Sequence, residues 1–138
     1  MISGFILGRS PRILARVSLP SLSTHTVGVG FLIDTGASVT VLPLSVLVDL
    51  GVDSEELRKM PLEQNIGGGG SILHALHPGA LEFTLDDGAH VSYRVLFRLA
   101  LTPAPDQAEV PCVLGMDILE AFRVTVSIRE DRVELLKT

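Results

Sequence analysis

A carboxylic acid stands at the end of an apolar run about a quarter of the way along the chain. The apolar stretch 31–33 leads directly into Asp34, Thr35 and Gly36 follow, and a second apolar run occupies residues 39–42. This order predicts a tight loop between two buried segments, where a carboxylate without a partner is costly. Thr35 supplies a hydroxyl group, and Gly36 lets other backbone come close. We interpret the loop as one that presents a single carboxyl group for acid or base chemistry.

A second pattern lies near the other end of the chain. The sequence VLGMDIL at 113–119 places two apolar residues and a glycine before a short predicted helix, and Phe122 follows. Together with DTGASVTVL at 34–42, it resembles the two signatures of the retropepsin-like aspartic proteases, the retroviral and retrotransposon type (clan AA). The presence of Ser38, where retroviral members have a second acid, makes the chain more similar to the bacterial and DNA-damage-inducible single-domain members. The resemblance covers residues 12–136.

The resemblance implies a fold and a set of site residues. The expected fold is all-β, a closed β-barrel-like acid protease fold with one short C-terminal helix, in which a single lobe dimerises. Asp34 is the expected catalytic residue. The residues expected to support the active-site loop, with Thr35 bonding reciprocally across the dimer, are Thr35, Gly36, Ala37 and Ser38. Leu114 and Gly115 are expected to pack beneath this loop, and Asp117 to cap or charge the start of the last helix.

The chemistry of such an enzyme requires two chains. Two carboxyl groups about 3 Å apart share one proton, because like charges that close cannot both ionise cheaply. This sequence has one Asp-Thr-Gly motif and about half the length of a two-lobed enzyme. We therefore expect a homodimer in which Asp34 meets its own copy, with water as the nucleophile, a polypeptide as the substrate, and neither metal nor cofactor.

Four consecutive glycines occupy residues 67–70. Glycine has no side chain to pack and a large conformational entropy in the unfolded chain, so by itself the run predicts a flexible hairpin. In the family that the chain resembles, a β-hairpin flap closes over bound peptide here. The expected flap and substrate-binding residues are Ile66, Gly67, Gly68, Gly69 and Gly70.

Composition excludes several other classes of protein. A length of 138 residues predicts one domain, 1–138, with a sizeable core. With 11 basic and 16 acidic residues spread along the chain, there is no basic patch for nucleic acid. The single cysteine, Cys112, lies in an apolar run and is expected to be a small buried hydrophobe. Four scattered histidines, His25, His74, His77 and His90, do not predict a metal site.

The N-terminal stretch does not predict a signal peptide for secretion. Residues 1–7 include apolar side chains without a positively charged segment before them, and no apolar run approaches the roughly 18 residues that cross a bilayer. We expect a soluble cytoplasmic protein without a membrane partner.

Short β-branched runs between Gly, Pro and Asp predict the order of the elements. Helices are expected at 43–50, as one turn at 53–59, and at 116–121, and the turn 86–88 is expected to join two strands. A loop is expected at 102–109. The predicted strands are 12–19, 26–33, 39–42, 72–77, 80–85, 91–101, 109–114, 124–128 and 133–136. We expect the last two of these to contribute to the dimer sheet.

Two alternatives stay open at this point. The first is a catalytically inactive dimeric module of the same fold that binds peptide or serves in assembly. The second is an unrelated β domain in which Asp34 only caps a turn. Against the first, a module that only binds peptide has no use for two buried acids that face each other.

Overall fold

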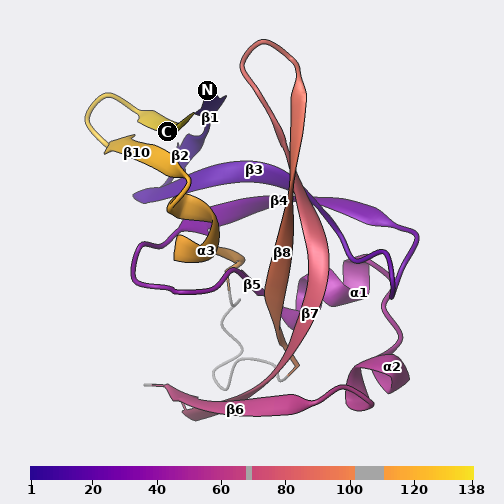
Figure 1. Cartoon of the computed structure of the whole chain (residues 1–138). Coiled ribbons are helices and arrows are strands. Elements are labelled where there is room, and N and C mark those ends of the chain that lie inside the picture. The colour runs from indigo at the N-terminus through magenta and orange to yellow at the C-terminus, as the bar shows by residue number, and fades with distance from the viewer. Residues whose placement is uncertain (68–69, 102–110) are drawn as a thin grey trace.

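The short apolar runs form strands, as their alternation predicts. The computed structural model describes residues 1–67, 70–101 and 111–138 (Figure 1). Its elements in chain order are β1 (Ile2–Ser3), β2 (Phe5–Leu7), β3 (Ser10–Ser18), β4 (Thr26–Ile33), β5 (Val41–Leu42), α1 (Leu44–Asp49), α2 (Ser54–Arg58), β6 (Leu62–Gly67), β7 (Gly70–Thr84), β8 (His90–Ala100), β9 (Val113–Leu114), α3 (Met116–Leu119), β10 (Phe122–Ser127) and β11 (Arg132–Lys137). The predicted loop 102–109 and the first residues of the predicted strand 109–114 lie outside the described residues.

The larger sheet folds back on itself. Its strand order is β2-β3-β4-β9-β5-β8-β7-β6, and β3 also pairs with β7 from Arg16 to Ser18. The link between β5 and β9 is a single registered pair, Val41 with Val113. The all-β prediction with a short C-terminal helix is therefore confirmed, but the sheet is less regular than the closed barrel that we expected.

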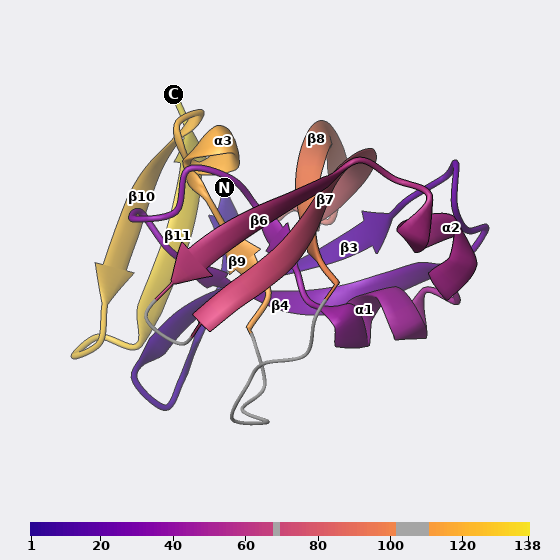
Figure 2. The ribbon, with the colours of Figure 1, turned by 90° about the horizontal axis from the view of Figure 1, so that it is seen from below.

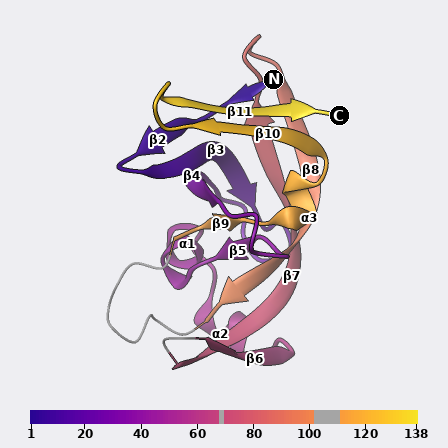
Figure 3. The ribbon, with the colours of Figure 1, turned by 90° about the vertical axis from the view of Figure 1, so that its left-hand side faces the viewer.

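A smaller sheet joins the first residues of the chain to its C-terminal strands. β11 lies in its centre, antiparallel to β1 on one side and to β10 on the other. Figure 3 shows this sheet alongside β2 and β3, with α3 leading into β10. Ile2 is buried in the core, so residues on the N-terminal side of residue 12 take part in the fold.

One core fills the space inside the folded sheet. On β3, Ile13, Ala15 and Val17 are buried while Leu14 is exposed, which is the period of two expected for a strand with one buried face. The largest buried side chains include Phe31, Phe83 and Phe97. The burial of Cys112, predicted from its apolar surroundings, is confirmed.

β7 is one continuous strand, although Pro78 and Gly79 predicted a break between two strands. Pro78 lies where β7 is paired on one side only, since β6 pairs with Gly70–Ala75 and β3 with Ala80–Glu82, so its missing N–H costs no ladder bond on that edge. A Cβ on Gly79 would lie 2.5 Å from the Ser18 carbonyl oxygen. Glycine therefore marks close packing at this position and not a turn.

The helical predictions near the middle of the chain are confirmed. α1 follows Pro43 and ends at Asp49, with Leu50 as its C-cap, and Gly51 then adopts a φ of +71°. α2 is capped by the side chain of Asp53, which accepts a hydrogen bond from the Glu55 N–H. Figure 2 shows both helices at the same end of the molecule. Within the described part of the chain, no helix is long and apolar enough to cross a membrane.

Candidate active site

The Asp34 loop begins where β4 ends. The Asp34 carboxylate oxygen Oδ1 accepts a hydrogen bond from the Gly36 N–H at 2.9 Å, and the Asp34 carbonyl accepts one from the Ala37 N–H at 3.2 Å. A Cβ at Gly36 would lie 3.2 Å from Oδ1, so a side chain there would crowd the carboxylate. The Asp34 side chain is half-buried, whereas Thr35 and Ser38 are exposed. The loop thus holds one carboxylate at the surface of the single chain.

The second sequence signature lies directly beneath this loop. β9 runs parallel to the end of β4, with Leu32 paired to Val113 and Ile33 to Leu114. The Asp34 N–H donates to the Leu114 carbonyl oxygen at 3.2 Å. Leu114 is fully buried. Two segments about eighty residues apart in sequence are therefore joined at the residue that carries the acid.

The first turn of α3 is held by the same loop. The N–H groups of Met116 and Asp117 donate to the carbonyl oxygens of Ala37 and Ser38, at 2.8 and 3.2 Å. Helix N-termini leave N–H groups without partners in the helix, and here backbone of the Asp34 loop supplies the acceptors. Gly115, the N-cap, packs against the Val39 backbone.

Asp117 ties α3 to a residue that the sequence analysis missed. Its carboxylate accepts from the Thr40 hydroxyl at 2.8 Å and from the Thr40 N–H at 3.0 Å. Thr40 is fully buried, and its Oγ1 accepts from the Gly115 N–H at 3.2 Å. Asp117 lies in the first turn of α3, so the expected negative charge at the start of this helix is confirmed. The N-cap is Gly115, and the Asp117 carboxylate binds Thr40. The signal for it was a hydroxyl residue inside an otherwise apolar run, Val39 to Leu42.

The hydrogen bonds between Asp117 and Thr40 should contribute to the stability of the fold. Replacing Asp117 by alanine leaves both Thr40 donors without an acceptor, so we expect a loss of about 2–3 kcal/mol in the free energy of unfolding. Thr40→Val should cost less, and the double variant should show a coupling of about 1 kcal/mol. Urea denaturation of the four proteins measures this cycle. Glu120→Ala, at an exposed position just after α3, is the control, and strictly additive losses would contradict the network.

The similarity of this chain to known proteins lies in its structure and not in its sequence. No protein-family model matches the sequence, and no curated protein matches it either. Among solved structures, the fold is similar to that of a retropepsin-like aspartic protease from Rickettsia conorii, with a TM-score of 0.61 and 20% identity over 96% of this chain and 95% of that one.

The chain has a retropepsin-like fold. Two further structures are similar to it. One is EIAV protease in complex with the inhibitor HBY-793, with a TM-score of 0.49 and 21% identity over 83% of this chain and 88% of that one. The other is the retroviral protease-like domain of Ddi1 from Leishmania major, with a TM-score of 0.44 and 12% identity over 91% of this chain and 94% of that one.

The glycine-rich segment belongs to a hairpin within this retropepsin-like fold. β6 and β7 pair antiparallel, from Leu62 with Ala75 to Gly67 with Gly70. Gly68 and Gly69 lie outside the described residues, as does the side chain of Ile66. The hairpin itself is visible in Figure 2, where β6 and the adjoining part of β7 lie side by side.

The C-terminal hairpin, β10 and β11, lies next to α3 in the retropepsin-like fold. β10 is an edge of the smaller sheet, and Val126 and Ile128 near its end are 41% and 47% exposed. On β11, hydrogen bonds from the Arg132 guanidinium lower the pKa of Glu134 below its usual range. Within the described residues, this hairpin therefore has exposed apolar side chains and an unpaired strand edge next to α3.

The histidines are dispersed in the fold. His77 lies in β7, where partial burial lowers its pKa and its Nε2 lies 2.6 Å from the Ser21 hydroxyl oxygen. His74 is buried in the same strand, and His90 begins β8. Among the residues that the structure describes, no three His, Cys, Asp or Glu side chains gather as metal ligands.

Proposed function

We propose that this chain is an aspartic endopeptidase in which Asp34 from each of two copies activates a water molecule. The observation that carries the proposal is the Asp34 carboxylate at the end of β4, hydrogen-bonded by Gly36 in a loop that β9 and α3 brace. The fold is similar to that of the retropepsin-like aspartic protease from Rickettsia conorii, which supports the same reaction here. Residues 1–138 would act as one domain.

The chemistry follows from two carboxyl groups and one shared proton. The ionised carboxyl group accepts a proton from water, which attacks the carbonyl carbon of the peptide bond, while the protonated one donates a hydrogen bond to the carbonyl oxygen. As the tetrahedral intermediate breaks, the carboxyl group that took up the proton from water passes it to the nitrogen of the leaving amine. Gly36, through its N–H, holds Asp34 in place, so the carboxylate needs little reorganisation in the reaction.

A homodimer supplies the second carboxyl group. Thr35 and Ser38 are exposed in the single chain, on the loop that would face its copy. Met116, at the start of α3, is 37% exposed, and Val126 and Ile128 add apolar surface on the C-terminal hairpin. A two-fold axis near the loop would cover these residues and bring the two Asp34 side chains together. The hairpin segment 66–70 would then serve as a flap that closes over a bound polypeptide.

A mixing experiment tests the shared site. Wild-type protein and Asp34→Asn are co-refolded in equal amounts and assayed on a mixed peptide library at constant total concentration. If each site needs one Asp34 from each copy, about one quarter of the wild-type activity should remain, because only one dimer in four is fully wild type. A mixture with Asp87→Asn, altered in an exposed turn, should keep full activity.

Other outcomes point elsewhere. An activity of about one half in the Asp34→Asn mixture would mean that each chain acts alone, which contradicts a shared site. If a well-folded wild-type dimer binds library peptides without cutting them, the chain is a peptide-binding module of the same fold. Sedimentation of the same samples gives the mass that separates these cases.

A further inference from the structure

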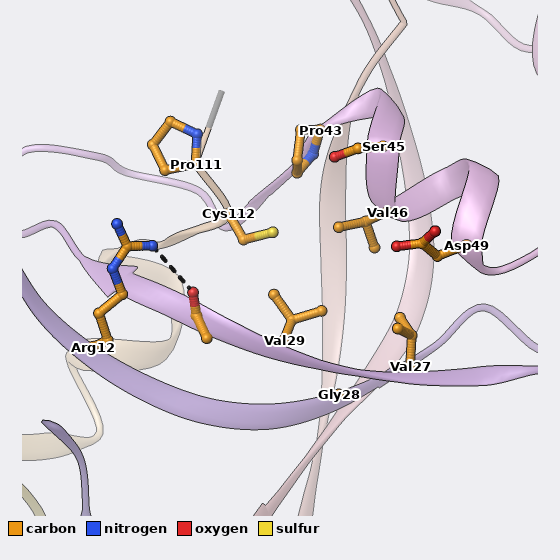
Figure 4. Close-up of a pocket in the computed structure, with 11 residues that line it drawn as sticks. Arg12, Val27, Gly28, Val29, Pro43, Ser45, Val46, Asp49, Pro111 and Cys112 are labelled. Carbon is orange, nitrogen blue, oxygen red and sulfur yellow. Dashed lines mark hydrogen bonds between the residues drawn. The ribbon is translucent and has the colours of Figure 1, made fainter. Parts of the chain in front are cut away.

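A cavity of about 360 Å³ lies away from the Asp34 loop, between β4, α1 and the residues just before β9. Figure 4 shows Arg12 at one end of it and Asp49 at the other, with Cys112, Val29 and Val46 between them. Its volume falls in the range of small-molecule sites, which are mostly apolar with a few placed polar groups. None of its lining residues belongs to the loop 34–38.

Among the residues that the structure describes, none forms an ion pair with Arg12 at this cavity. Its Nη1 donates to the Gly30 carbonyl oxygen at 3.4 Å, and its enclosed Nε has no hydrogen-bond partner. A half-buried guanidinium presents several donors in a planar fork that suits a carboxylate, and leaving such donors unpaired is costly. An anionic group bound at this end would compensate the charge.

The rest of the cavity restricts what such a ligand can carry. Val29, Val46 and Cys112 are each less than a tenth exposed and line the middle with apolar surface. Gly28 adds no side chain to the β4 wall, and a Cβ there would meet nothing within 4 Å. Asp49 at the far end would repel a second negative charge, whereas Ser45, one helical turn earlier in α1, offers a hydroxyl group.

We propose that this cavity binds a small monocarboxylic acid with an apolar body. The carboxylate pairs with Arg12, the hydrocarbon chain covers Val29, Val46 and Cys112, and the far end of the ligand is neutral or carries an amine next to Asp49. The site is independent of the proposed proteolysis, because it requires neither Asp34 nor a second copy of the chain.

A calorimetric titration with four six-carbon probes tests the ligand class. Hexanoate and 6-aminohexanoate should bind, whereas adipate, with a second carboxylate, and hexylamine, with none, should bind at least several-fold more weakly. Arg12→Gln should abolish hexanoate binding, and Arg12→Lys should retain part of it. Arg16→Gln is the matched control, since Arg16 is an exposed arginine of the same strand that does not line this cavity. Equal binding of all four probes, or binding unaffected by Arg12→Gln, would overturn the proposal.

The single cysteine provides a second measurement that needs no bound probe. Iodoacetate and iodoacetamide both alkylate Cys112, since the thiolate sulfur attacks the CH₂ carbon, iodide leaves and the thiol proton passes to solvent. They differ in that only iodoacetate carries a carboxylate. The rate with iodoacetate divided by the rate with iodoacetamide should fall several-fold in Arg12→Gln and stay constant in Arg16→Gln. Hexanoate should slow both reactions in the wild type.

This ratio also separates the cavity from the proposed enzyme. It corrects for any change in thiol ionisation, because both reagents need the same thiolate. The measurement is repeated in Asp34→Asn, where the same ratio is expected even though proteolysis would be lost. A ratio that does not respond to Arg12→Gln, with circular dichroism showing a folded variant, would exclude an anion site at Arg12.

Discussion

Replacing Asp34 by asparagine is expected to lower peptide cleavage at least about a thousandfold, because an amide can neither accept a proton from water nor share one with a second carboxyl group. The fold should survive. The asparagine side-chain oxygen can still accept the Gly36 N–H, so the free energy of unfolding should change by less than about 1 kcal/mol. Initial rates on one cleavable library peptide, with urea denaturation of the same samples, measure both effects.

The matched control for this variant is Asp87→Asn. Asp87 is an exposed acid in the turn between β7 and β8, where its side chain accepts the Ala89 N–H, a bond that asparagine can also make. Its cleavage rate should equal that of the wild type. Undiminished cleavage by Asp34→Asn would refute the proposed mechanism, whereas unfolding of that variant would mean that the carboxylate serves the fold.

Gly115→Ala is expected to cause the largest loss of stability near the site. A Cβ at this position would lie 2.6 Å from both the carbonyl carbon and the oxygen of Val39, so backbone must move to admit one methyl group. Gly115 has φ −95° and ψ −178°, an extended conformation that alanine adopts freely, so the cost comes from packing. Overpacking of this kind costs about 3 kcal/mol. Differential scanning calorimetry should show a melting temperature lower by about 10 °C.

The same substitution should also impair the proposed catalysis. The Val39 backbone follows the Asp34 loop directly, and the Gly115 N–H donates to Thr40. A shift at Gly115 therefore displaces both the backbone after the Asp34 loop and the hydrogen bond that joins Gly115 to Thr40. Gly28→Ala, in β4, is the control because its new Cβ would meet nothing within 4 Å. Equal melting temperatures for Gly115→Ala and the wild type would show that the close contact with Val39 relaxes at no cost.

Much of the fold was predictable from local patterns. Alternating apolar residues predicted β3 and β4, Pro43 and Gly51 predicted the ends of α1, and Asp86 to Gly88 predicted the turn before β8. The predicted break in β7 was wrong because long-range packing overrides a local signal. Pro78 and Gly79 have the local chemistry of a break, but β7 continues through them because its neighbours leave one edge of Pro78 unpaired and pack closely on Gly79.

The sequence by itself also singled out Asp34 as a candidate acid, because a carboxylate between two apolar runs is rare without a purpose. What only the tertiary structure decided is how that acid is held. The parallel pairing of β4 with β9, the capping of α3 by the Asp34 loop and the bonds between Thr40 and Asp117 join residues about eighty positions apart. The cavity at Arg12 arises in the same way, since β3, β4 and α1 meet there only in the folded chain. Local propensity carries no information on such long-range pairs, which are set by the packing of the whole core.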